Sequence, residues 1–144
     1  MSSFGATAVE DGGPAVPDDC LVAARAADSK SGEDIVILAM AELLGLTDAF
    51  VITSGRNRRQ VRTIVDEIER QVHERGGRKP TRVEGLDDAR WVLMDYGDFL
   101  VHVFLDEARH FYDLEHLWSG APRLEWDGLA PPDPSAGSGS GGLG

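Results

Sequence analysis

The sequence is poor in cysteine and in basic residues, and it lacks long apolar runs. Its 144 residues include a single cysteine, Cys20, which excludes an internal disulfide bond and a zinc site built from several cysteines. Only 14 residues are lysine or arginine, against 25 acidic residues, so the formal net charge is −11. This balance argues against a protein that holds nucleic acid mainly through its phosphates. No apolar run approaches the roughly 20 residues of a membrane helix, and we expect no membrane association.

The first residues carry no recognisable targeting signal. Residues 1–19 contain acidic side chains and no lysine or arginine. A secretory signal needs a basic start followed by an apolar stretch, and an organellar transit peptide is rich in arginine and poor in acids. Because neither pattern is present, we expect a cytoplasmic protein of bacterial type.

Both ends of the chain differ in composition from its middle. Residues 1–17 are rich in Gly, Ala, Ser and Pro, and residues 127–144 are rich in Pro, Gly and Ser. Segments of this composition have too little apolar surface to form a core. We therefore expect a disordered N-terminal extension over 1–17, one domain over 18–126 and a disordered tail over 127–144.

Apolar periodicity predicts the main elements of this domain. The continuous apolar runs 35–38 and 49–53 are typical of buried strands, whereas 41–44 is ambiguous. A helix over about 58–75 is predicted by five apolar residues at helical spacing, with Gly76-Gly77 as its stop. This stripe consists of Val61, Ile64, Val65, Ile68 and Val72.

Polar residues mark further boundaries. Asp18 is the predicted N-cap of a helix that runs to about Ala27, and Asp106 and Asp113 are predicted N-caps of two short helices. Residues 81–83 form a short predicted strand. In the two short helices we expect four apolar side chains to face inward, namely Phe111, Leu114, Leu117 and Trp118.

A hairpin completes the predicted sheet. Its strands, 91–96 and 99–105, are joined by Gly97-Asp98, a two-residue loop whose glycine allows a positive φ. The hairpin is antiparallel, while the strand–helix–strand unit around 49–83 should form a right-handed parallel crossover. We predict a small single-domain α/β fold with a mixed sheet of about five strands and flanking helices.

The register of this hairpin assigns its side chains to two faces. The face expected to be core consists of Val92, Met94, Tyr96, Phe99, Val101 and Val103. The other face consists of Trp91, Leu93, Asp95, Leu100, His102 and Phe104. Its mixture of large apolar groups with an acid and an imidazole is typical of an interface centre. The competing interpretation is that a helix covers this face and Asp95 pairs with His102 or a nearby arginine.

Residues that could bind a metal or support catalysis are few. His110 and His116 are six apart, which does not suit a shared metal, and Cys20 beside an apolar run is expected to be buried. The best enzymatic candidate is Thr53-Ser54-Gly55, at a strand end before a helix, where backbone N–H groups can hold an anion.

This candidate departs from the chemistry it would need. Nucleotidyltransferases place a Gly-Ser pair there and follow it with paired acids that bind two magnesium ions. Here the order of the pair is reversed and no paired acids follow on the next strand. A nucleotidyltransferase-like enzyme that binds nucleotide near Ser54 stays the alternative, and we expect no catalytic residue, cofactor or metal.

Charge is segregated along the chain. Acidic residues dominate 1–53 and 83–127, whereas basic residues outnumber acidic ones in 54–82. The hairpin and the segment after it would form an acidic lobe. This lobe is either a solvated surface or a region that attracts a basic partner.

A series of short motifs extends in order over roughly residues 20–124. It consists of Glu33-Asp34-Ile35-Val36, Leu46-Thr47-Asp48-Ala49-Phe50-Val51-Ile52, Ser54-Gly55, Arg59-Gln60-Val61, Val83-Glu84-Gly85, Trp91-Val92-Leu93, Asp95-Tyr96-Gly97-Asp98, Val101-His102-Val103-Phe104 and Phe111-Tyr112-Asp113-Leu114-Glu115-His116-Leu117-Trp118. The ordered set resembles the bacterial ribosomal silencing factor family, also called the Iojap-like family. The resemblance implies a fold related to the nucleotidyltransferases but without their active site, and a role that is not enzymatic.

The resemblance also implies a function and a contact site. Family members bind a large-subunit ribosomal protein on the face that meets the small subunit, block subunit joining and so lower translation in starvation or stationary phase. The family's ribosomal contact includes the Trp-containing strand and the Asp-x-Gly-Asp turn. The corresponding residues here are Trp91, Leu93, Met94, Asp95, Tyr96 and Asp98. An acidic lobe suits a basic ribosomal protein as the partner.

The chain departs from the family pattern after Ser54-Gly55, where small polar residues and an acid are usual. Here Arg56-Asn57-Arg58 and Arg59 make the start of the long helix basic. These arginines would either contact ribosomal RNA or balance the acidic lobe.

The apolar face around Trp91 has a second consequence. Exposed apolar patches associate when no partner covers them. We therefore expect a weak homodimer through the same face, in competition with the ribosome.

Overall fold

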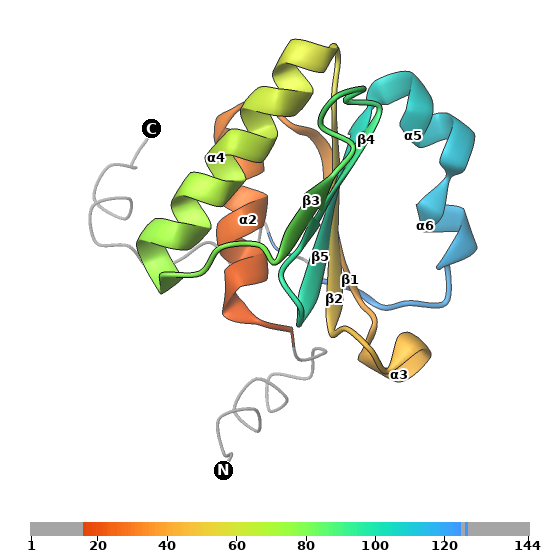
Figure 1. Cartoon of the computed structure of the whole chain (residues 1–144). Coiled ribbons are helices and arrows are strands. Elements are labelled where there is room, and N and C mark those ends of the chain that lie inside the picture. The colour runs from red at the N-terminus through yellow and green to blue at the C-terminus, as the bar shows by residue number, and fades with distance from the viewer. Residues whose placement is uncertain (1–15, 125, 127–144) are drawn as a thin grey trace, which may run out of the picture.

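The computed structural model describes residues 16–124 and 126 as a six-stranded sheet with helices on both faces (Figure 1). The strands are β1 (Glu33–Ala39), β2 (Ala49–Gly55), β3 (Arg82–Glu84), β4 (Trp91–Asp95), β5 (Phe99–Leu105) and β6 (Arg123–Leu124). The helices are α2 (Asp18–Ser29), α3 (Ala41–Leu44), α4 (Arg58–Gly76), α5 (Asp106–Tyr112) and α6 (Leu114–Leu117). The predicted α/β class with a mixed sheet is confirmed. Of the segments predicted to be disordered, 1–17 and 127–144, residues 1–15 and 127–144 lie outside the described residues.

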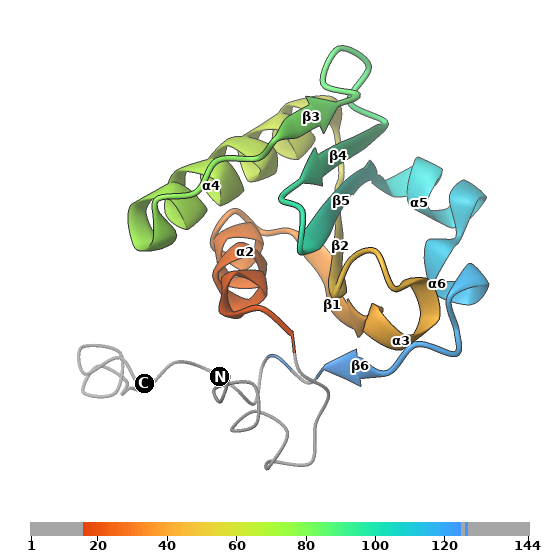
Figure 2. The same cartoon turned by 60° about the horizontal axis from the view of Figure 1, so that its bottom comes forward.

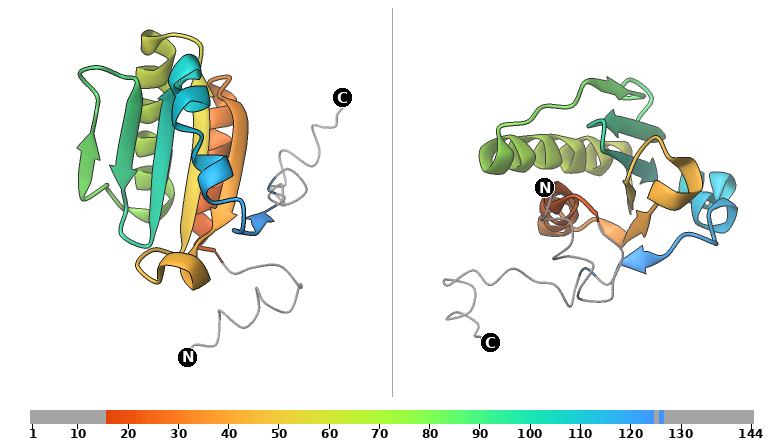
Figure 3. Two further views of the ribbon diagram at one scale, coloured as in Figure 1. Left: turned by 90° about the vertical axis from the view of Figure 1, so that its right-hand side faces the viewer. Right: turned by 90° about the horizontal axis from the view of Figure 1, so that it is seen from below.

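The two faces of the sheet are covered unequally. α2 and α4 lie side by side against one face, and α5 and α6 lie beside the other (Figure 1). α5 packs against β5 and β2, and the two short helices leave β3 and most of β4 open (Figure 3). β6 pairs with the outer edge of β1 (Figure 2). One half of one sheet face is therefore left without a covering helix.

The predicted apolar stripe of α4 lies at the centre of the core. All five of its residues are buried, and Cys20 is buried with four alanines of α2 beside it. Each fully buried Val or Ile contributes about 1.5–3 kcal/mol relative to an exposed one. α4 ends at Gly76 and is capped, as predicted, by Gly77, whose φ of 73° is a conformation that glycine adopts without strain. Within the part of the chain that the structure describes, no helix is long and apolar enough to cross a membrane.

Two of the three predicted N-caps are wrong by one residue. Asp18 is the first residue of α2 and follows Pro17, and Asp106 is the first residue of α5 and follows Leu105. In the first turn their carboxylates still interact favourably with the positive end of the helix dipole. Asp113 caps α6 as predicted, because its side chain accepts a hydrogen bond from the His116 N–H at 3.4 Å.

The prediction that four apolar residues of α5 and α6 face inward is half wrong. Leu114 is buried and Trp118 packs edge-on against Phe50 at 6.2 Å, but Phe111 is 77% exposed and Leu117 is 66% exposed. α5 has seven residues and α6 has four. Helices of one or two turns present no repeating stripe, so the sequence alone does not determine which side chains meet the sheet.

The strand order differs from the simplest expectation. β2 and β3 run in the same direction, as predicted for the two strands that α4 connects, but β4 and β5 lie between them. The parallel neighbour of β2 is β5, with Ile52 opposite His102 and Ser54 opposite Phe104. The two-residue β6 was not predicted, because it is too short to show a periodicity.

The predicted hairpin register is confirmed. The Tyr96 N–H donates to the Phe99 carbonyl at 3.0 Å across Gly97-Asp98, and Met94 lies opposite Val101. All six residues of the expected core face are buried. The ambiguous segment 41–44 is the short helix α3.

Candidate partner-binding surface

The second face of the hairpin divides into a buried part and an open part. His102 and Phe104 on β5 are buried, with exposed fractions of 5% and 1%. The residues left partly exposed are Trp91, Leu93 and Asp95 on β4 and Leu100 on β5. We call these four residues the open face. Its centre is apolar, and α5 borders it through Tyr112, which is 43% exposed.

Trp91 is held by aromatic neighbours on two elements. Its ring centroid lies 5.1 Å from that of Phe104 and 4.7 Å from that of Tyr112. Its indole Nε1–H donates a hydrogen bond to His102 Nδ1 at 3.1 Å. An aromatic side chain with part of its ring exposed and its position constrained has the character of an interface anchor.

His102 is buried behind this anchor. Its ring centroid lies 4.6 Å from that of Phe50 in an edge arrangement. Burial lowers the pKa of His102 to about 4, because a charged imidazolium is unfavourable in an apolar environment. The side chain is therefore neutral at neutral pH.

The two acidic residues predicted as charge partners already have partners within the chain. Asp95 accepts a hydrogen bond from the Gly97 N–H at 2.9 Å and lies 3.4 Å from Arg82 Nη2. Asp98 accepts from Arg78 at 2.6 Å, and this bond raises the pKa of the guanidinium. Both carboxylates shape the β4–β5 turn. The competing interpretation offered two partners for Asp95. Asp95 pairs with an arginine, Arg82, and not with His102.

The structure does not bring all six predicted contact residues to one surface. Trp91, Leu93 and Asp95 share the open face, and Asp98 lies in the adjoining turn. Met94 is fully buried and Tyr96 is 5% exposed, on the opposite side of the hairpin. Side chains of a strand alternate between faces, so these two residues pack in the core.

Sequence reasoning left two bordering residues out of the predicted site. Leu100 lies on the open face opposite Asp95, and the two-residue alternation of β5 was sufficient to include it. Tyr112 comes from α5 and meets Trp91 only through the tertiary fold. No local sequence signal indicates that contact.

The basic start of α4 supports the loop that leads into Trp91. Arg58 Nε donates to the Asp88 carbonyl at 2.8 Å, and Arg62 donates to the carbonyls of Leu86 and Asp87 at 3.2 and 2.9 Å. Arg56 instead pairs with Glu33 at 2.9 Å. These bonds account for much of the unusual basic cluster without an external partner.

Gly85 places this loop against the strand. Its φ is +93°, and a Cβ at this position would overlap the carbonyl oxygen of Trp91. Gly97 has a nearly equal φ of +91°, but a Cβ there would meet no atom within 4 Å. Comparing substitutions at these two glycines therefore distinguishes the energetic cost of a positive φ from the cost of a steric collision.

Both substitutions place alanine at a positive φ, which costs about 1–3 kcal/mol. Gly85→Ala adds the collision with the Trp91 carbonyl oxygen. We therefore expect it to destabilise the protein by roughly 1 kcal/mol or more beyond the effect of Gly97→Ala. Urea unfolding of both variants measures this difference. Equal losses of stability would show that the loop yields easily and does not constrain Trp91.

The Ser54 region does not have the form of a phosphate site. Ser54 is buried, and its Oγ accepts a hydrogen bond from the buried guanidinium of Arg109 at 3.2 Å. Arg109 also donates to the Asp34 carbonyl at 2.7 Å and to Glu115 at 3.0 Å. At the start of α4, the Gln60 N–H donates to Asn57 Oδ1 at 2.8 Å. The N–H groups of Arg56 and Gln60 and the guanidinium of Arg109 therefore already have acceptors within the chain.

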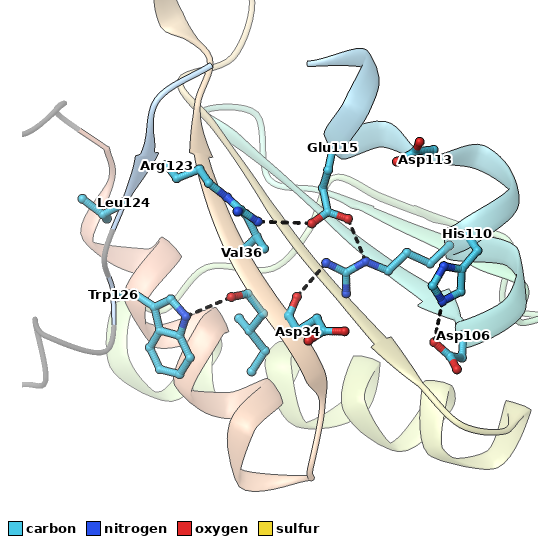
Figure 4. A pocket seen from close by; sticks show the side chains of 11 residues that line it. Asp34, Val36, Asp106, His110, Asp113, Glu115, Arg123, Leu124 and Trp126 are labelled. Atoms are coloured by element: carbon cyan, nitrogen blue, oxygen red, sulfur yellow. Dashed lines mark hydrogen bonds and ion pairs between the residues drawn. The ribbon is translucent and has the colours of Figure 1, made fainter. Parts of the chain in front are cut away.

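A pocket of about 520 Å³ lies on the outer side of this network (Figure 4). Asp34, Asp106, Asp113 and Glu115 contribute to its lining, and the charge of Arg109 is already neutralised by Glu115. A polyanionic nucleotide would meet mostly negative charge in this pocket.

Titration of the protein with magnesium and each nucleoside triphosphate is therefore expected to give no binding heat in calorimetry. A saturable heat that Ser54→Ala removes would contradict this expectation and support the enzymatic alternative.

Fold and surface define a class of protein. A small α/β domain presents a half-open sheet face with an aromatic centre, and among the described residues no three His, Cys, Asp or Glu side chains are grouped to hold a metal. This arrangement suits a regulator that binds another macromolecule.

Comparison with known proteins identifies the family. The profile of "Ribosomal silencing factor during starvation" matches residues 14–140. Ribosomal silencing factor RsfS of Bacillus subtilis (strain 168) is 43% identical over 106 residues, which are 74% of this chain and 89% of that protein. A crystal structure of a protein from Chromobacterium violaceum has a TM-score of 0.68 at 31% identity and covers 71% of this chain and 84% of that one. The chain belongs to the ribosomal silencing factor family.

A more distant relative from Mus musculus is named mitochondrial assembly of ribosomal large subunit protein 1. It is 30% identical over 92 residues, which are 62% of this chain and 40% of that protein. The predicted resemblance is thus confirmed, and membership of the family assigns the chain a ribosome-associated role in silencing translation.

Proposed function

We propose that the protein is a translational repressor that binds the large ribosomal subunit through a basic ribosomal protein on its inter-subunit face. Bound there, it blocks association with the small subunit and lowers translation in starvation or stationary phase. The observation that carries this proposal is the open face, on which Trp91, Leu93 and Leu100 stay partly exposed although Tyr112 of α5 packs against one part of the Trp91 ring. The family and the name of the mouse relative support the ribosomal partner.

The apolar and the acidic residues around the open face contribute differently to binding. Trp91, Leu93 and Leu100 supply apolar area, and Tyr112 extends it onto α5. Asp95 and Asp98 are paired with Arg82 and Arg78, so the negative potential that a basic partner would meet comes mainly from the net charge of −11. Negative potential steers a basic protein toward the face and orients it there.

The arginines at the start of α4 favour a protein partner over ribosomal RNA. The side chains of Arg56 and Arg58 are exposed, but Arg56 pairs with Glu33 and Arg58 donates a hydrogen bond to the Asp88 carbonyl. The net charge of −11 opposes close approach to RNA phosphates. We propose a cytoplasmic protein that needs only affinity and bulk at the subunit interface.

Density-gradient sedimentation with isolated large subunits, isolated small subunits and joined ribosomes tests this function. The protein is expected with large subunits alone, and its addition is expected to keep separated subunits from joining. Protein that stays at the top of the gradient in all three mixtures would refute the proposed function.

The same face is proposed to form a weak homodimer when no ribosome is present. Two copies of the open face would cover each other's Trp91 and Leu93. Light scattering over a range of concentrations is expected to show reversible dimerisation that Trp91→Glu removes. A monomer at high concentration would contradict this part of the proposal.

A further inference from the structure

A buried histidine stands directly behind the proposed anchor of the open face. The indole N–H of Trp91 can only donate, so the Nδ1 of His102 that it reaches at 3.1 Å must carry a free lone pair. The proton of the neutral imidazole is therefore on Nε2. The geometry thus defines both the tautomer of His102 and the direction of the indole.

The position of this pair in the sheet explains how the histidine acts. On β4 and β5 Trp91 lies opposite Phe104, and Leu93 lies opposite His102. The bond from Trp91 to His102 is thus a diagonal cross-strand contact, which large side chains span. It directs the indole along β5, while Tyr112 packs against its ring at 4.7 Å.

The histidine is a costly residue for this place. Its Nε2 is buried and has no hydrogen-bond partner among the described residues. A buried N–H without a partner destabilises the folded state, whereas an apolar side chain of similar size would not. A leucine at position 102 would pack against Phe50 and Phe104 as well as the imidazole does. Stability therefore does not explain His102, but control of the neighbouring indole does.

We propose that His102 is a positioning residue for partner binding, whose Nδ1 holds the Trp91 indole in the orientation that the partner meets. This inference rests on the proposed function. Pre-orientation lowers the entropy that the side chain loses on binding. The exposed part of the ring is then presented as a rigid surface next to Leu93.

Three substitutions at one position test the inference. In His102→Asn the side-chain oxygen lies near the place of Nδ1, in His102→Gln the amide lies near the place of Nε2, and His102→Leu has no acceptor. We expect His102→Leu and His102→Gln to weaken binding to isolated large subunits by about tenfold, and His102→Asn to restore most of the affinity. The midpoint of urea unfolding should not fall in His102→Leu.

A nitrogen NMR measurement on the unaltered protein gives a second readout. We expect a His102 ring protonated at Nε2 alone and a Trp91 indole N–H protected from solvent exchange. A ring protonated at Nδ1 would overturn the inference directly, even if a variant failed to fold.

The binding results separate this inference from the proposed function. If Trp91→Ala loses binding but His102→Leu binds like the unaltered protein, the positioning role is refuted and the surface stands. If neither variant loses binding, both the positioning role and the assignment of the open face are refuted. If His102→Leu loses binding and His102→Asn does not recover it, the acceptor at Nδ1 is not what matters, and the inference fails.

Discussion

Replacing Trp91 with glutamate is expected to abolish sedimentation with isolated large subunits while the fold persists. The indole is partly exposed at the end of the open face that borders α5, and a carboxylate there would be desolvated by any partner that covers it. Truncation to alanine should cost about 2–4 kcal/mol of binding free energy, which corresponds to about a 30-fold to 1,000-fold loss of affinity. Quantitative sedimentation of both variants measures the effect.

The matched control for this substitution is Arg59→Glu. Arg59 is exposed on α4, and its side chain makes no hydrogen bond or ion pair with another described residue. We expect this variant to sediment with large subunits like the unaltered protein. Loss of binding in Arg59→Glu but not in Trp91→Glu would move the contact to the basic start of α4. An unfolded Trp91→Glu in circular dichroism would show that Trp91 belongs to the core.

A second large effect is expected in the pH dependence of stability. The pKa of His102 falls from 6.5 to about 4 in the folded state, so the unfolded chain binds the extra proton over this range. The free energy of unfolding therefore decreases as pH is lowered from about 6.5 to about 4, by about 3 kcal/mol from this residue. Above pH 6.5 His102 is neutral in both the folded and the unfolded state and does not change the stability with pH. Below pH 4 it is protonated in both states, so the loss of stability from this residue does not increase further.

His102→Leu isolates this effect from the titration of other groups. His73, His110 and His116 are exposed and are present in both proteins, so their contributions cancel in the comparison. Urea unfolding at several pH values is expected to show a difference between the two proteins that grows as pH falls through this range. A difference that stays constant with pH would show that the imidazole is accessible to protons in the folded state.

Several elements follow from local sequence patterns because their burial is periodic. The stripe of α4 repeats over five residues, and all of them are buried. The hairpin faces follow from one two-residue loop, since strand alternation then assigns every side chain. Both patterns are long enough that a single packing arrangement satisfies them.

Other features could not be predicted, because they depend on partners distant in the sequence. Arg109 on α5 reaches Ser54, Asp34 and Glu115, and only the folded chain brings these acceptors together. The outward side chains of Phe111 and Leu117 and the two-residue β6 lie in elements too short for periodicity. Residues Asp95 and Asp98 looked available for a partner until the structure showed their bonds to Arg82 and Arg78.

By itself the sequence determined the family, the α/β class and the two faces of the hairpin, because these depend on residue identity and on local alternation. The tertiary structure decided which part of the outer face stays open. α5 packs against β5 and β2, so His102 and Phe104 on β5 are buried while Trp91 and Leu93 on β4 stay partly exposed. It also decided that His102 meets Trp91, because a hydrogen bond between neighbouring strands exists only once the strands pair.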